Sequence, residues 1–255
     1  MKGFVAFCRK EWLEGLRTYR LWIMMAVFAA LGILSPLFAK LLPDLLSGTD
    51  IGGGVTLQMP PATAFDSWTQ FFKNVSQLGS LVLIIVFCGI TATEFSRGTL
   101  VNVLTKGLRR STIVVAKLAV AALIWTISYL VSLGIAFGYT LYFWGDGTLQ
   151  NAGLAFVSPW LFGLFLLALM ILGGIVGGNI YGSLLAAGGM IIALNIVAIV
   201  PKSARFNPLS LAGGTLGLLD GQNQPRDFVP ALLICVAAIV VTLAASLLVI
   251  DRKQL

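Results

Sequence analysis

The sequence predicts an all-α integral membrane protein, and three observations lead to that fold class. Hydrophobic residues make up 58% of the 255 residues, charged residues only 11%, and the mean hydropathy is +0.95. Six apolar runs are long enough for a helix to cross a hydrocarbon core about 30 Å thick. Lys and Arg gather at the ends of these runs, as they do in membrane proteins. We therefore expect a single membrane domain over residues 1–255.

The expected elements follow from these runs in chain order. An amphipathic helix over 1–20 precedes the first run, and the spans are expected at about 21–39, 75–93, 113–143, 155–176, 182–200 and 230–250. In the first helix, Val5, Trp12 and Tyr19 recur at helical spacing, while Arg9 and Arg17 fall mostly on the other side. This pattern is typical of a helix lying in the membrane interface. The alternative is a solvated start to the first span.

Two connections on the outer side differ in composition. Residues 43–69 contain Gly48, a glycine run at 52–54 and Pro60-Pro61, which predicts a loop without helix or strand. Residues 202–227 contain a short apolar stretch at 209–219 that cannot span the bilayer. We expect a re-entrant or interfacial helical segment there, just before the sixth span.

The apolar run over 160–200 is about twice as long as one span. We divide it at its glycine cluster into the fourth and fifth spans; one long helix plus a buried segment is the alternative. The GxxxG patterns of Gly173 with Gly177, Gly174 with Gly178 and Gly178 with Gly182 favour close helix packing. They indicate a tight hairpin between these spans, or else a dimer contact or a hinge.

The distribution of cations predicts that both termini are cytoplasmic. Six spans with the N-terminus inside leave five cations outside, and these are Lys40, Lys73, Lys202, Arg205 and Arg226. All other Lys and Arg residues then lie on the cytoplasmic side, as the positive-inside rule requires.

Several kinds of chemistry are missing from the chain. It has no histidine and no GxxxxGK[ST] motif, which argues against histidine-dependent hydrolysis, most transition-metal sites and a phosphate-binding loop for ATP. We expect no catalytic residue and no metal ligand. No Asp or Glu lies in the middle of a span, and Lys117 is expected to extend its ammonium group toward the cytoplasmic boundary.

Polar residues within the spans are candidates for a transport path or a helix interface. Gln77, Ser80 and Thr91 fall roughly on one face of a continuous helix, and Asn195 lies in the fifth span. In lipid such groups turn toward protein or a cavity. Interhelical hydrogen bonding and cavity lining are both open interpretations.

The segment 94–110 is the longest basic interruption between two spans, with Glu94 at its start and Arg109 and Arg110 at its end. Phe95, Leu100 and other apolar residues recur in it at helical spacing. We expect a cytoplasmic helix that binds a soluble partner, with Glu94 favoured at its N-terminus by the helix dipole. The alternative is a solvated loop that only follows the positive-inside rule.

This segment resembles the one after the second span in type-2 ABC transporter permeases. The resemblance is carried by Glu94, 98–100, 104–106, Arg109 and Lys117, although relatives often have proline where this chain has Gly107. The residues 9–12, the six-span layout and Asn207-Pro208 before the last span are also similar to that family. The resemblance therefore covers essentially the whole chain.

The resemblance implies a permease subunit of an ATP-driven exporter in the prokaryotic inner (plasma) membrane. It implies a coupling helix that contacts two copies of a cytosolic ABC ATPase, which bind ATP and Mg²⁺, and pairing with a second permease copy; this chain itself is no enzyme and holds no cofactor. The substrate class stays open. The residues that the resemblance assigns to partner binding are Glu94, Arg97, Gly98, Thr99, Leu104, Lys106, Arg109 and Arg110.

A membrane scaffold or assembly factor is the competing interpretation, because a scaffold could bind a cytosolic partner through the same segment without moving a substrate. An intramembrane lipid-processing enzyme is disfavoured, since the chain lacks a histidine base and paired carboxylates within the spans.

Overall fold

The computed structural model describes residues 2–46, 60–96, 109–145, 149, 151–214, 216–219, 221 and 223–253. These residues form helices and no strand, so the predicted all-α class is confirmed for the described part of the chain. Six helical segments are long and apolar enough to cross a membrane, as predicted: Arg20–Pro43, Ala64–Glu94, Arg110–Trp144, Ala152–Gly177, Ile180–Ala198 and Pro225–Arg252. Five predicted partner-binding residues lie outside the described residues: Arg97, Gly98, Thr99, Leu104 and Lys106.

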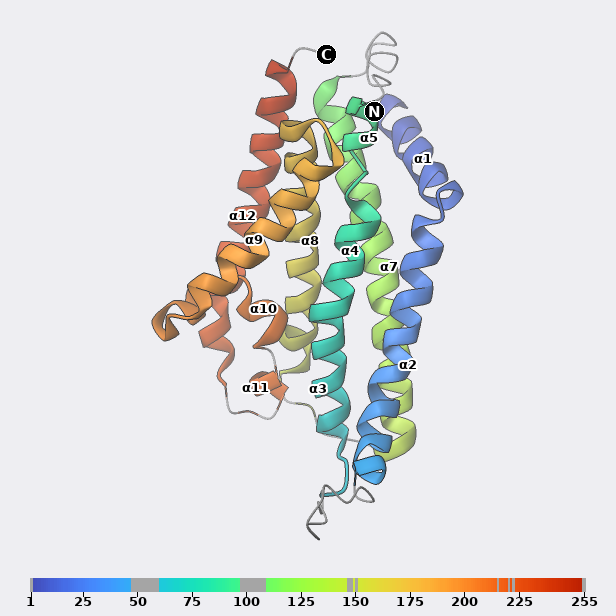
Figure 1. The fold of residues 1–255 in the computed structure, drawn as a ribbon, viewed down its shortest axis with the longest axis vertical. Helices are drawn as coiled ribbons and strands as arrows, with labels where there is room; N and C mark the ends of the chain where they lie inside the picture. The colour runs from blue at the N-terminus through green and yellow to red at the C-terminus, as the bar shows by residue number, and fades with distance from the viewer. Residues whose placement is uncertain are drawn as a thin grey trace.

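Most of the long helices run side by side, and both chain ends lie at the same end of the bundle (Figure 1). We call this the N/C end and the opposite one the far end. Helix α1 (Lys2–Arg17) lies at the N/C end, and α2 (Arg20–Leu46) and α7 (Arg110–Trp144) both start there. Gly32 allows α2 to approach α7 closely, because a Cβ at this position would lie 2.6 Å from the carbonyl oxygen of Ser132.

The second span is longer than predicted and is interrupted twice. It consists of α3 (Ala64–Asn74), a π-helical turn η1 (Val75–Gly79), α4 (Ser80–Phe87) and, after a turn, α5 (Ala92–Ser96). The prediction of a loop without helix over 43–69 was therefore wrong at both ends, since α2 continues to Leu46 and α3 starts at Ala64. A capping box between Thr63 and Asp66 starts α3, in which Asp66 accepts a hydrogen bond from the Thr63 N–H at 2.8 Å.

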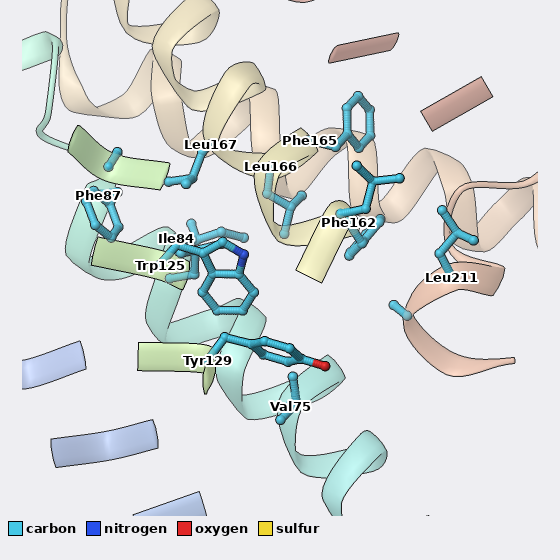
Figure 2. Close-up of a cluster of buried hydrophobic side chains, with 14 of the residues drawn as sticks. Val75, Ile84, Phe87, Trp125, Tyr129, Phe162, Phe165, Leu166, Leu167 and Leu211 are labelled. Atoms are coloured by element: carbon cyan, nitrogen blue, oxygen red, sulfur yellow. The ribbon is translucent and has the colours of Figure 1, made fainter. Parts of the chain in front are cut away.

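Aromatic side chains between α3, α4, α7 and α8 (Ala152–Gly177) form the centre of the bundle. Trp125 packs edge-to-face with Phe28 of α2 at a centroid distance of 5.2 Å, and its indole N–H donates to the Trp160 carbonyl at 3.0 Å. Figure 2 shows Trp125 and Tyr129 beside Ile84 of α4, with side chains of α8 close by. The polar atoms of both large rings are paired, since the Tyr129 hydroxyl donates to the Phe156 carbonyl at 2.7 Å.

Helices α8 and α9 (Ile180–Ala198) form the tight hairpin that the glycine spacing predicted. A Cβ at Gly173 would collide with the carbonyl oxygen of Gly182, and one at Gly177 would lie 2.8 Å from the Gly182 Cα. Gly178 ends α8 at φ 65°, which glycine adopts without strain, and the Asn179 side chain accepts from the Gly182 N–H to start α9. The predicted division of the 160–200 run is thus confirmed.

The segment before the last span contains three short helices: η2 (Pro201–Phe206), α10 (Ser210–Gly213) and α11 (Leu216–Leu219). The last two bury Leu211, Ala212, Leu218 and Leu219 against α8, α12 (Pro225–Arg252) and α3. Asn207 fixes their start, because its amide donates to the Leu194 carbonyl and its oxygen accepts from the Leu209 N–H. A re-entrant position within a bilayer stays a prediction.

Candidate functional site

Helix α1 packs along the N/C end of α7 through one buried stripe. Phe7, Glu11 and Gly15 recur every four residues and are all buried. At Gly15 the contact is close, since a Cβ there would lie 3.0 Å from Ile124 Cδ1 of α7. A carboxylate in the middle of a buried stripe needs a partner, and α7 supplies one.

That partner is Lys117, whose side chain is fully buried. Its Nζ lies 3.0 Å from Glu11 Oε2 and 3.0 Å from Glu94 Oε2. The Lys117 ammonium group is therefore bound by carboxylates inside the protein, and its position relative to a membrane boundary stays a prediction. The sequence shows a lysine within a hydrophobic run, but not that the two carboxylates reach it from distant parts of the chain.

A second lysine completes the group. Lys10 Nζ lies 2.8 Å from Glu11 Oε1, 2.8 Å from Glu14 Oε2 and 2.7 Å from Glu94 Oε1. We call Lys10, Glu11, Glu14, Glu94 and Lys117 the ionic cluster. It ties α1 and α7 to α5, the last described helix before residues 97–108.

The charges of the ionic cluster almost balance, and Arg20, 4.0 Å from Glu14, brings the third positive charge. Burial alone would raise the pKa of Glu14, but the hydrogen bond and charge of Lys10 outweigh it and hold that pKa below its usual value. Burial alone would lower the pKa of Lys10, yet hydrogen bonds to Glu11, Glu14 and Glu94 raise it well above its usual value. Both groups are therefore charged near neutral pH.

Glu11, Glu14 and Glu94 bring their carboxylate oxygens within 4.8 Å of one another, a spacing that could hold a metal ion. Lysine ammonium groups already contact each of these carboxylates at 2.7–3.0 Å. They supply the positive charge that a metal ion would bring, so the donor set does not call for one.

Two further basic side chains bind helix C-termini at the same end. Arg110 Nη1 donates to the carbonyls of Ile250 at 2.8 Å and Lys253 at 2.6 Å, at the end of α12. Lys253 Nζ in turn donates to the Ile175 carbonyl at 2.5 Å, in the last turn of α8. Cations at these positions satisfy free carbonyls and complement the helix dipole. Arg110, predicted to bind a partner, is thus engaged within the chain, while Arg109 is exposed.

The predicted path residues differ in burial. Gln77 is exposed, Ser80 is half-buried and Thr91 is buried. The offsets assumed an uninterrupted α-helix, whereas η1 and the turn at 88–91 change the direction of the side chains. Among the described residues, the Thr91 hydroxyl has no hydrogen-bond partner. Asn195 is exposed and donates to the Ile191 carbonyl of its own helix at 2.8 Å.

Interhelical hydrogen bonds do occur at other residues of the second span, such as the one from the Asn74 amide to the Ser35 hydroxyl of α2 at 3.0 Å. The Ser76 hydroxyl, in the second span, donates to the Ala212 carbonyl of α10. It joins the π-helical turn to the segment before the last span.

These features define a multi-pass helical membrane protein with a charged, tightly tied N/C end. No family model matches the chain. It is similar to the uncharacterized transmembrane protein YxlG of Bacillus subtilis (strain 168), with 22% identity over 220 residues that cover 83% of each chain. The relative is also a transmembrane protein, in agreement with the six long apolar helices.

Proposed function

We propose that this chain is the membrane-spanning permease subunit of an ATP-driven exporter and that its 94–110 segment binds a separate ATPase. The observation that carries the proposal is the ionic cluster. Glu94 is the first residue of the segment and lies at the end of the second span. Its carboxylate is bound by Lys10 and Lys117. A displacement of the segment would therefore act first on α1 and α7.

The C-terminal end of the 94–110 segment is tied to the bundle as well. Arg109 and Arg110 are its last two residues, and Arg110, the first residue of α7, holds the C-terminal end of α12. Lys253 extends this connection to the end of α8. A partner that moves the segment would thus act on α1, α7, α12 and α8 through charged side chains, which suits a coupling role better than a solvated loop.

The absence of an ATP-binding motif from the chain supports a separate ATP-hydrolysing subunit. The chain has no GxxxxGK[ST] motif and no histidine, so ATP and Mg²⁺ are assigned to a cytosolic partner. The least buried spans are α9 and α12, which expose many apolar side chains. These faces suit contact with lipid and with a second permease copy.

Site-directed cross-linking tests the partner. Cys8, Cys88 and Cys235 are first replaced by Ala, and a single cysteine is then introduced as Arg109→Cys at the N/C end or as Lys73→Cys in the last turn of α3; both positions are exposed. In intact membranes we expect Arg109→Cys to cross-link to a subunit with a phosphate-binding loop and Lys73→Cys not to do so. Equal capture by both variants, or no ATPase captured by either, would refute the proposal.

A transport measurement separates the permease from a scaffold. The chain and its captured ATPase are reconstituted in vesicles, and ATP hydrolysis is measured with fluorescent amphiphilic dyes. We expect a dye to stimulate hydrolysis and to move in an ATP-dependent manner, with both effects reduced by Glu94→Gln. Tight binding of the ATPase without stimulation or movement would support the scaffold instead.

A further inference from the structure

The outward face of α1 combines arginines with apolar side chains. Val5, Arg9, Leu13 and Arg17 recur every four residues, so they form one stripe along the helix, and all four are exposed. The expectation that Val5 lies on the side opposite the arginines was therefore wrong. The opposite stripe is the buried one that packs on α7. Figure 1 shows α1 on the outside of the bundle, inclined to the long helices. Its outward stripe is therefore open to the surroundings of the protein.

The face of α1 toward the ionic cluster carries the acidic side chains, and the outward face carries arginines. Glu11 and Glu14 are bound by the lysines of the ionic cluster. Arg9 and Arg17 make no ion pair within the part of the chain that the structure describes. The acidic groups are thus neutralised internally, and the outward face is left with unneutralised positive charge.

The position of this face relative to the first span favours a lipid surface. Arg17 lies three residues before Arg20, where the first span begins. Between them the chain turns at Tyr19, at φ 60°, and both Tyr19 and Trp22 are more than half exposed. Exposed Tyr and Trp beside the end of a span are typical of the membrane boundary. Only Thr18 and Tyr19 separate α1 from α2, so α1 is held close to that boundary.

We propose that the outward face of α1 binds anionic phospholipids in the leaflet at the N/C end. Arg17 and Arg9 bind the lipid phosphates through charge-assisted hydrogen bonds, and Leu13, Val5 and Trp22 contact the upper part of the acyl chains. An acidic protein would match the arginines but not the apolar residues alternating with them. The inference is independent of the proposed permease function and applies equally to a scaffold.

Lipid binding to the full-length chain tests this inference. The purified protein in mild detergent is titrated with short-chain phosphatidylglycerol or phosphatidylcholine, and bound lipids are counted by native mass spectrometry. We compare Arg17→Gln, Arg9→Gln and the double variant with Lys73→Gln, which changes an exposed cation in the last turn of α3. One basic residue near an anionic surface contributes an affinity factor of about five.

We expect tighter binding of phosphatidylglycerol than of phosphatidylcholine, about fivefold weaker binding in Arg17→Gln and up to about twenty-five-fold in the double variant. Arg9 lies two turns further from the span, so its effect should be smaller, and Lys73→Gln should behave as the unchanged chain. Equal affinity for both lipids, or no effect of the arginine variants, would overturn the inference. So would competition by inorganic phosphate or an acidic peptide at concentrations similar to the lipid, because it would indicate a free anion or a protein as the ligand.

Discussion

Replacing Lys117 by Met tests the ionic cluster most directly. The change keeps a side chain of similar length but removes the charge that lies 3.0 Å from both Glu11 and Glu94. All three side chains are almost fully buried, so the carboxylates would be left in a poorly solvated site with Lys10 as their remaining lysine. Breaking a buried ion pair on one side costs about 3–5 kcal/mol. Because Lys10 still contacts both carboxylates, we expect the lower value, about 3 kcal/mol.

Thermal unfolding in mild detergent, followed by tryptophan fluorescence, measures this loss. A loss of about 3 kcal/mol corresponds to roughly 6–12 °C in melting temperature for a chain of this size. Lys73→Met, at an exposed position in the last turn of α3, serves as the control and should change the stability by less than about 0.5 kcal/mol. Adding Glu11→Gln and Glu94→Gln to Lys117→Met removes the unpaired charges and should restore part of the stability. A Lys117→Met protein as stable as the control would show that the reasoning about the cluster is wrong.

Three further predictions concern the same end of the bundle and its packing. Arg110→Ala should cost about 1–2 kcal/mol, since it removes charge-assisted bonds to the end of α12, and hydrogen exchange at 250–253 should become faster. Gly182→Ala should lower the melting temperature by forcing α8 and α9 apart, at a cost of about 1–3 kcal/mol, whereas Gly188→Ala, which meets nothing within 4 Å, should not. The lowered pKa of Glu14 means that its contribution to stability is present above the usual value of 4.5 and is lost as pH falls through the folded-state pKa. The raised pKa of Lys10 gives a contribution to stability that is present below pH 10.5 and is lost as pH rises through the folded-state pKa. Melting curves recorded between about pH 5 and 10 should therefore coincide. Glu14→Gln should weaken the loss of stability on the acid side.

Features that depend on local sequence were predicted well. Span positions follow from the length of apolar runs, and the α8–α9 hairpin follows from glycines spaced so that two backbones can meet. The start of α3 was missed because its capping box is adjacent to a stretch rich in Gly and Pro, although Thr63 and Asp66 have the spacing of such a box. The π-helical turn η1 has no clear sequence signal, and it interrupts the regular α-helical spacing that was assumed between Gln77 and Thr91.

The ionic cluster could not be located from sequence spacing, because Glu94 and Lys10 are separated by 84 positions and Lys117 and Glu11 by 106. The sequence did contain a partial indication of the cluster, which is Lys117 itself. A lysine within a hydrophobic run needs a carboxylate nearby unless it reaches water. The candidates were the few acidic residues beside the same ends of the spans, and Glu11 and Glu94 are among them.

The bond from Lys253 to the end of α8 also constrains the order in which the protein can be completed during synthesis. The ammonium group is translated 78 residues after the Ile175 carbonyl that it binds. The Ile175 carbonyl therefore stays without this ammonium partner until Lys253 has been synthesised and the end of α12 lies beside the end of α8. A ribosome stalled between these two residues would hold a chain in which the carbonyl still lacks this partner.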